Sequence, residues 1–260
     1  MSARRRLPAA LVGLSMLLAL VAACGGDGSG GTSDVVAQIP FTAGERMAYE
    51  LRNNTGEIVA QGILSTRRED ADLVLRQEYQ QLGEPEGEDP ATDTIAVTVD
   101  GLTLKPASGS RLITQRAPGD SVDTDEYEWQ YLADQEHGSL AVTRQRTDET
   151  EERDLSLREN HYDNESSLWL WRTLDLADGY EARYVSVNHL DPSQQTVTVR
   201  VTRRQTIDVP AGTFETWRLL VRTGRATRVV WISMASPHEV VQWDNGSLVF
   251  RLTESVAIDE

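Results

Sequence analysis

The histidines are the first candidates for chemistry in this chain, because imidazole serves both as a general base and as a metal ligand. Zinc sites, including the HExxH motif, place histidines a few residues apart on one element. The four histidines here are far apart in sequence, and HExxH is absent: His137, His161, His189 and His238. His161 lies near the carboxylates of Asp163 and Glu165, but this segment has the pattern of a helix start that Asp163 or Asn164 would cap. The sequence therefore predicts neither a metal site nor a catalytic residue, and no cofactor.

Acidic side chains gather in three stretches, at 83–93, 118–128 and 147–154. Several carboxylates close together are what Ca²⁺ prefers, since hard cations take several oxygen ligands. The spacing of the second stretch does not match an EF-hand loop, which needs a glycine at its sixth position and a glutamate at its twelfth. We therefore interpret all three stretches as solvated loops. Lys105, the only lysine, follows a short apolar run and is interpreted as a surface residue at a strand end. Nucleophile elbows and glycine-rich phosphate loops are not found in the sequence.

Tryptophan is the most informative remaining residue type, with six of the 16 aromatic side chains. Large rings most often fill a core, whereas several rings around one hollow form the wall of an apolar ligand site. Trp169 and Trp171 are two residues apart in a predicted short helix from Asn164 to Leu174. Only one of these two rings is expected to face the core, because successive helical residues are 100° apart. Five rings are candidate ligand-binding residues: Trp169, Trp171, Trp217, Trp231 and Trp243.

The only cysteine, Cys24, ends the apolar part of an N-terminal export signal. Arg4, Arg5 and Arg6 precede an uncharged run from Leu7 to Ala23, which is shorter than the roughly 20 residues of a membrane span. The segment Val21-Ala22-Ala23-Cys24 resembles the lipobox of bacterial lipoproteins, whose cysteine is lipidated and becomes the mature N-terminus. The resemblance implies that residues 1–23 are a signal peptide. It also implies an extracytoplasmic protein that lipidated Cys24 anchors to the bacterial membrane.

Glycine and serine dominate the residues that follow Cys24, which indicates a flexible tether. We therefore divide the chain into the signal peptide, the lipidated cysteine with its tether over residues 24–38, and one β-rich domain over residues 39–260. The net charge is −16, and it becomes −19 when the three arginines of the signal are removed. An acidic chain repels nucleic acid and anionic headgroups. Nucleic acid is therefore excluded as a partner, and the lipid is the main attachment to the membrane.

Alternation of apolar and polar residues is the dominant signal in the proposed domain. It is clearest at 47–52, 95–100, 196–202 and 247–253. Period-2 alternation places one face of a strand on a core and the other face in water. Asn, Asp and Gly, which form tight turns, separate several of these runs. Strands joined by such short turns pair antiparallel, so the sequence predicts a meander.

Motifs in the second half of the chain carry a resemblance to a known family. They are Tyr162-Asp163 before a serine-rich short helix, the strand start Val209–Trp217, and the strands at Trp231–Ser233 and Pro237–Val241. These motifs resemble those of a family of exported bacterial β proteins of unknown function; the resemblance covers most of residues 45–254. Such proteins are similar in fold to lipoprotein-localisation carriers. The resemblance implies a strongly curved antiparallel sheet, an incomplete barrel, with one or two short helices and a hydrophobic cavity.

Three classes of function follow from these observations. The first is an extracytoplasmic lipoprotein whose non-catalytic domain binds or carries an apolar, acyl-like ligand. The second is a structural or protein-interaction module of the cell envelope. The third, an enzyme, is disfavoured because strong sites usually leave a local motif. A cavity lined by the tryptophans would favour the first class, a bare strand edge the second, and a cleft joining a histidine to two carboxylates the third.

Overall fold

The computed structural model describes residues 31–83, 89–116, 122–133, 138–146, 149–224 and 226–257, with only the backbone of Arg116. These residues form fifteen strands, one turn of α-helix and one turn of 3-10 helix. The predicted mainly β fold is therefore confirmed. Cys24 lies outside the described residues.

Eight strands form the first half of the domain, and each is joined to the next by a turn or connection at alternate ends. They are β1 (Glu45–Arg52), β2 (Ile58–Glu69), β3 (Asp72–Gln81), β4 (Thr92–Asp100), β5 (Pro106–Arg116), β6 (Val122–Leu132), β7 (Ser139–Arg146) and β8 (Glu149–Ser156).

A short irregular segment links this half to the second. It contains β9 (His161–Asp163), the helical turn α1 (Ser167–Leu170) and the 3-10 turn η1 (Trp171–Thr173). Six strands follow: β10 (Glu181–Asn188), β11 (Ser193–Val209), β12 (Gly212–Thr223), β13 (Ala226–Ser233), β14 (Val240–Asp244) and β15 (Val249–Ala257).

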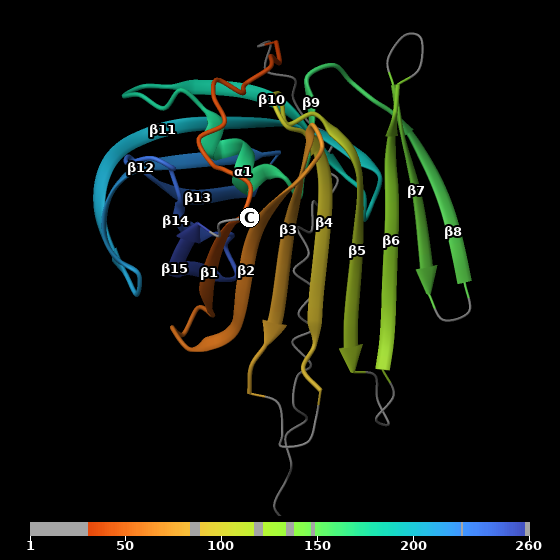
Figure 1. Ribbon diagram of the computed structural model, residues 1–260, viewed down its shortest axis with the longest axis horizontal. Helices are drawn as coiled ribbons and strands as arrows, with labels where there is room; N and C mark the ends of the chain where they lie inside the picture. Colours follow the sequence, from red (N-terminus) through yellow and green to blue (C-terminus); the bar gives the residue numbers. More distant parts are fainter. Residues whose placement is uncertain are drawn as a thin grey trace, which may run out of the picture.

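All fifteen strands belong to one sheet, in which β1 pairs with β15 and the two meanders thereby become continuous. The described pairs are antiparallel, except that β9 runs parallel to β10. The sheet begins at β8 and ends at β9, so it is curved but not closed (Figure 1). The predicted incomplete barrel is thereby confirmed, and the gap between its two edge strands is the seam of the barrel.

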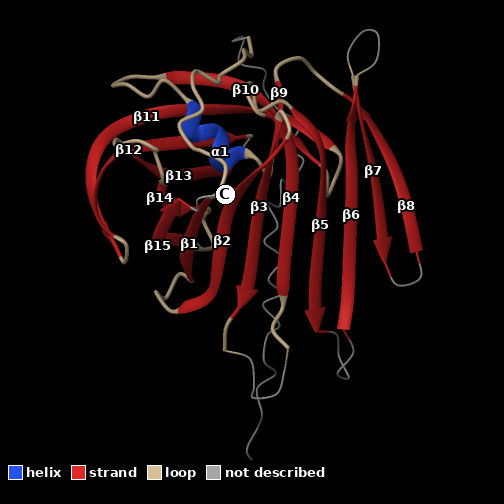
Figure 2. Ribbon diagram, in the orientation of Figure 1, coloured by secondary structure: helices blue, strands red, loops and turns tan. Residues whose placement is uncertain are grey.

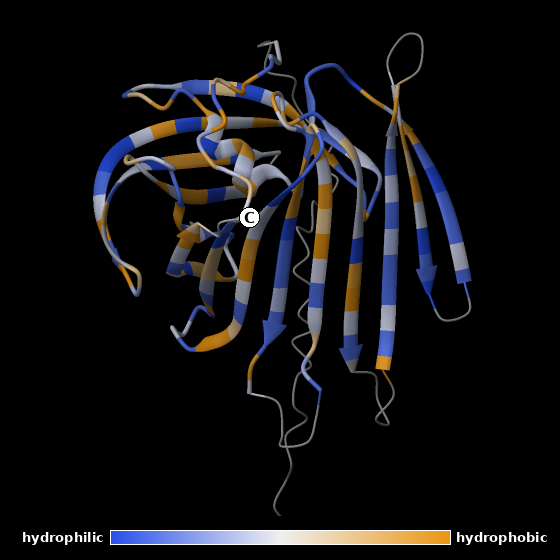
Figure 3. Ribbon diagram, in the orientation of Figure 1, coloured by the Kyte–Doolittle hydropathy of each residue, from blue (hydrophilic) through white to orange (hydrophobic). Residues whose placement is uncertain are grey.

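The helical segment lies in the hollow of the curved sheet, between β1–β5 and β10–β13 (Figures 1 and 2). Alternation along the strands places one apolar row on the inner face, and hydrophobic bands alternate with hydrophilic ones in Figure 3. Strand β4 shows the pattern well, because Ile95, Val97 and Val99 are buried while the residues between them are partly exposed. Period-2 burial of this kind is what the sequence predicted.

Arg172 fixes η1 to both halves of the sheet. Its guanidinium pairs with Glu45 on β1 at 2.8 Å and donates to the carbonyl oxygens of Pro237 and His238 at 3.0 and 2.9 Å. The guanidinium carbon also lies 4.6 Å from the centroid of the Phe41 ring. The charge is buried but paired, which such a group requires.

Two of the predicted acidic loops are strands. Residues 122–132 form β6 and residues 149–156 form β8. In β6 the carboxylates of Glu126 and Glu128 are exposed, while the alternate residues Tyr127 and Trp129 are buried. The acidic run thus occupies one face of a strand, and the charge density concealed the period-2 pattern.

The helix is shorter than predicted and begins differently. Its N-cap is Ser166, with no capping hydrogen bond from a side chain. The prediction that Asp163 or Asn164 caps it was wrong, because Asp163 belongs to β9 and its side chain is buried under the sheet. Both Trp169 and Trp171 are buried, at 1% and 3% exposure, although one ring was expected to face away from the core. The reason is that the curved sheet covers one side of this helical segment and the N-terminal segment covers the other, where the amides of Ala37 and Gln38 donate to the carbonyl oxygen of Thr173.

Candidate functional site

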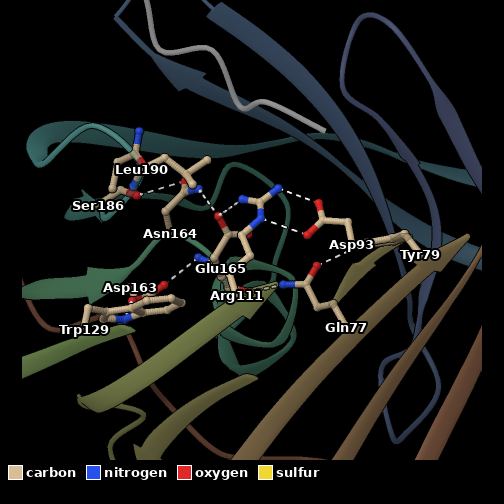
Figure 4. A network of polar contacts seen from close by, with 11 residues as sticks. Gln77, Tyr79, Asp93, Arg111, Trp129, Asp163, Asn164, Glu165, Ser186 and Leu190 are labelled. Atoms are coloured by element: carbon tan, nitrogen blue, oxygen red, sulfur yellow. Dashed lines mark hydrogen bonds and ion pairs between the residues drawn. The ribbon is translucent and has the colours of Figure 1, made fainter. Parts of the chain in front are cut away.

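A buried polar network fills the space between the inner face of β3–β6 and the segment that enters α1 (Figure 4). Its sheet members occupy inward positions on neighbouring strands: Gln77 on β3, Asp93 on β4, Arg111 on β5 and Trp129 on β6. The opposite wall is formed by Asp163, Asn164 and Glu165.

Arg111 is the central charge of this network. Its guanidinium binds both oxygens of Asp93, at 2.9 and 2.5 Å, and contacts Glu165 at 3.3 Å. All three side chains are at most 5% exposed. Burial raises the pKa of Asp93 and Glu165, and the positive charge of Arg111 opposes that rise. Burial alone would lower the pKa of Arg111, but the carboxylates of Glu165 and Asp93 raise it.

Gln77 extends the network to the backbone. Its amide nitrogen donates to the carbonyl oxygen of Glu165 at 2.5 Å, and its carbonyl accepts from the hydroxyl of Tyr79 at 2.6 Å. Ser186 on β10 donates to Asn164 at 3.3 Å, so the far half of the sheet is also connected. These contacts hold residues 164–165 against both halves of the barrel.

Asp163 accepts three hydrogen bonds. They come from the indole of Trp129 at 2.8 Å, the hydroxyl of Tyr131 at 2.7 Å and the backbone amide of Glu165 at 2.7 Å. Burial raises the pKa of Asp163 to about 7, although the hydrogen bond from Tyr131 acts in the opposite direction. His189 stacks on Trp129 with ring centroids 3.7 Å apart, and burial lowers the pKa of His189 well below its usual value.

The network has the chemistry of a structural clamp. Its carboxylates accept hydrogen bonds from Arg111, from the two aromatic donors or from the backbone, and buried polar groups are stable when they are satisfied in this way. None of these contacts pairs a nucleophile with a base. We therefore assign the network to the positioning of α1.

A separate cleft of about 500 Å³ opens at the seam of the barrel. We call it the seam cleft. It lies where the ends of β5, β6 and β7 meet the connection from β8 to β9 and the N-terminal segment. Its lining residues include Asp34, Lys105, Tyr131, Leu132, Leu157 and His161.

Lys105 and His161 dominate the polar chemistry of the seam cleft. The ammonium of Lys105 pairs with Asp34 and lies 4.0 Å from the ring centroid of Tyr162. The Nδ1 atom of His161 lies 2.8 Å from the carbonyl oxygen of Arg158, and burial lowers the pKa of this imidazole. The ring of Tyr131 lies parallel to that of His161, so Tyr131 connects the cleft to Asp163 in the buried network.

The five candidate tryptophans are all buried. Trp169, Trp171, Trp217 and Trp243 belong to one hydrophobic core, while Trp231 is buried outside it. The indole of Trp171 donates to Tyr184 at 3.0 Å and that of Trp231 to Gln205 at 3.2 Å. The indole nitrogens of Trp169 and Trp243 are buried without a hydrogen-bond partner among the described residues. A ligand-binding role for these rings stays a prediction.

The sequence did not predict the buried network, although it contains a signal for it. Asp93 lies on the same face of its strand as Ile95, Val97 and Val99, because all are an even number of residues apart. Gln77 shares a face with Leu75 in the same way. A polar residue in the inward row of an alternating strand must find a buried partner. The seam cleft has no such signal, because its residues come from five separate segments.

The comparison with known families decides the affiliation of the chain. Residues 48–253 match DUF3108, a family of proteins of unknown function. The chain belongs to this family. None of the curated proteins compared with this DUF3108 protein matches it.

Solved structures place the DUF3108 chain among known folds. A beta-barrel-like protein of the DUF1849 family from Brucella abortus has a TM-score of 0.52, with 9% identity over 87% of this chain and 100% of that one. This likeness shows a shared beta-barrel-like fold. Two further structures have lower TM-scores, and we draw nothing from them. One is described as exported, with a YmcC-like fold, from Bacteroides fragilis (0.32; 9% identity; 85% and 99% covered). The other is described as a lipoprotein, from Parabacteroides distasonis (0.33; 8%; 86% and 100%).

No group of three or more His, Cys, Asp or Glu side chains within the described ranges is arranged to hold a metal ion. No helix in the same ranges is long and apolar enough to cross a membrane.

Proposed function

We propose that this protein is a lipid-anchored extracytoplasmic binding module, whose non-catalytic domain takes an acyl-bearing amphipathic ligand in the seam cleft. The observation that carries the proposal is the position of the cleft beside the N-terminal segment. Asp34 forms part of its wall and pairs with Lys105 at the start of β5.

The last part of the proposed tether is held against the domain at this same end. Asn160 donates to the carbonyl oxygen of Thr32, and the amide of Ser33 donates to the carbonyl oxygen of Arg183, both at 3.0 Å. Ten residues separate Asp34 from Cys24, a chain that spans at most about 35 Å when extended. A lipid on Cys24 would therefore keep the cleft within that distance of the membrane surface.

The lining of the seam cleft is amphipathic. Leu132 and Leu157 supply apolar surface, while the lining also holds two positive and two negative side chains: Lys105, Arg158, Asp34 and Glu159. A volume of about 500 Å³ lies in the range of small-molecule sites, which combine apolar walls with a few polar groups. An acyl chain with a polar head fits this combination. The rings of Trp169 and Trp171 would become accessible only if α1 moved, so we place the ligand in the cleft.

The cleft does contain a histidine and two carboxylates, the arrangement that would favour an enzyme. Asp34, however, is paired with Lys105, and the Nδ1 atom of His161 is directed to the carbonyl oxygen of Arg158. No hydrogen bond joins His161 to a carboxylate among the described residues. A general base needs such an orienting group and a nucleophile within reach, so this geometry supports binding over catalysis.

A protein-interaction module is the second candidate, and the edge strand β8 favours it. No described strand pairs with the outer side of β8. The amide of Leu157, directly after β8, donates to the carbonyl oxygen of Gly138, directly before β7. Alternate residues of β8, such as Glu152 and Asp154, therefore direct their backbone N–H and C=O groups away from β7, toward the unpaired edge. A bare edge of this kind can accept an added strand, although charged side chains discourage it.

We expect Cys24→Ala to release the protein from the membrane. Without the thiol, no lipid is attached, and no other strong attachment is available to a chain of charge −19. Cell fractionation with detection of the chain measures this, with the native chain as control. Unchanged membrane retention together with unchanged precursor processing would refute the anchor.

We expect Ala133→Trp to block ligand binding at the seam cleft. Ala133 lines the cleft and is exposed, so a large ring there fills the opening without disturbing the core. Native mass spectrometry of the full chain, extracted in mild detergent, should show an acyl-bearing ligand on the native protein and on the control Leu82→Trp. The variant Ala133→Trp should have lost it. Equal ligand occupancy in both variants would place the ligand elsewhere.

A further inference from the structure

The turn between β4 and β5 presents one leucine to solvent. Leu102 is 83% exposed, whereas the other exposed large hydrophobic residues among the described residues lie between 39% and 59%. A single exposed leucine is ordinary on a protein surface. The conformation and the location of this turn indicate a more specific role for Leu102.

The turn is held rigid by Asp100. One of its carboxylate oxygens accepts hydrogen bonds from the amides of Leu102 and Thr103, at 3.1 and 2.8 Å, and from the Thr103 hydroxyl at 2.7 Å. Leu104, two residues further along, is fully buried and anchors the turn in the core. The backbone of Leu102 is therefore fixed with its side chain outward, and little backbone conformational entropy would be lost if another surface covered it.

Leu102 lies at the same end of the barrel as the seam cleft and the N-terminal segment. Lys105, three residues after Leu102, pairs with Asp34, and the amide of Gly101 donates to Ala71 in the neighbouring turn. Leu132, which is 48% exposed, ends β6 at this end and lines the cleft. Figure 1 shows the N-terminal segment, the start of β5 and the end of β6 at one end of the molecule.

The charge of the chain determines what kind of contact this end can make with a lipid bilayer. At −19 after processing, the protein has no electrostatic attraction to anionic lipids. The lipid on Cys24 is the main attachment, and a second, weaker contact at the same end of the domain adds to it. A rigid apolar side chain next to the tethered end can supply that contact without positive charge.

We infer that the β4–β5 turn inserts Leu102 into the surface of the bilayer that holds Cys24. The inference rests on the lipid anchor of the proposed function. The contact turns the end of the barrel with the seam cleft toward the lipid, so an acyl-bearing ligand passes between bilayer and cleft over a short distance. Ile58, 46% exposed at the start of β2, lies at the opposite end and stays in water.

The test uses the full lipidated chain in phosphatidylcholine vesicles. Cys24 is the only cysteine, and acylation blocks its sulfur, so Leu102→Cys and Ile58→Cys each provide one free thiol for an environment-sensitive dye. Quenchers attached to the lipid chains should reduce the emission of the dye at position 102 at least about threefold more than at position 58, because shallow insertion reaches about 5–10 Å.

Each outcome has one meaning. Equal quenching at the two positions, with one dye per chain, would overturn the membrane contact and leave the anchor intact. Two dyes per chain would show that Cys24 is not lipidated, and the anchor itself would then fail. Loss of co-purified ligand from the cleft affects neither readout, so the ligand proposal is tested separately.

Discussion

Arg111→Leu is expected to lower the free energy of unfolding by about 3–5 kcal/mol, because it leaves buried carboxylates without their counter-charge. Asp93 and Glu165 both contact this guanidinium, and all three side chains are almost completely buried. Leucine fills part of the volume but offers no hydrogen-bond donor. Denaturant unfolding followed by far-UV circular dichroism measures the loss.

Arg76→Leu is the matched control for Arg111→Leu. Arg76 also pairs with a carboxylate, Glu78, but both side chains lie on the outer face of β3 and are 40–50% exposed. An exposed ion pair contributes at most about 1 kcal/mol, so this variant should remain close to the native protein. If the two variants lost equal stability, the buried network would not be the clamp that we describe.

Gly109→Val is expected to destabilise the protein by about 3 kcal/mol or more, because it displaces a buried indole. Gly109 and Trp129 are cross-strand partners on β5 and β6. A Cβ atom on Gly109 would lie 2.2 Å from the Trp129 ring, a distance that neither group can accept. Overpacking costs about 1–3 kcal/mol, and losing the hydrogen bond from Trp129 to buried Asp163 adds about 1.5–3 kcal/mol.

Ser110→Val is the control, because it introduces the same side chain on the opposite face of β5. Ser110 is exposed, and valine suits a strand, so its effect should be small. Thermal unfolding together with tryptophan emission distinguishes the two variants, since only Gly109→Val should shift the emission of the core. A small effect of Gly109→Val would mean that the indole can move without cost, and that Asp163 does not depend on it.

The strands of this protein were predictable wherever alternation and turn residues coincide. β1, β4, β11 and β15 follow the period-2 runs, since an apolar inner row and a polar outer row are visible in sequence. β6 and β8 were missed because carboxylates on the solvent face dominated the composition of those segments. A high proportion of charged residues indicates that one face of a segment is exposed to solvent. A strand of an antiparallel sheet can have such a face, as a loop can.

The two candidate sites were harder to predict for different reasons. The clamp around Arg111 combines single residues from separate strands, and its only sequence signal is a polar residue at an inward position. The seam cleft depends on which strands are left unpaired at the edges, and that follows from the whole sheet order. The burial of both Trp169 and Trp171 has a similar origin, because helical periodicity assumes one buried face, whereas the curved sheet and the N-terminal segment together cover this helical segment.

The pairing of β1 with β15 has a consequence for the order of folding. Every other neighbouring pair of described strands is consecutive along the chain. All of these pairs except the parallel pair β9–β10 can form as local hairpins soon after synthesis. β1 gains its second neighbour only when β15, the last strand described, is available. Until then, one side of β1 is unprotected and can pair with another chain. We expect closure between the two halves to be the slow step of folding, and the newly synthesised chain to be most prone to aggregate before it.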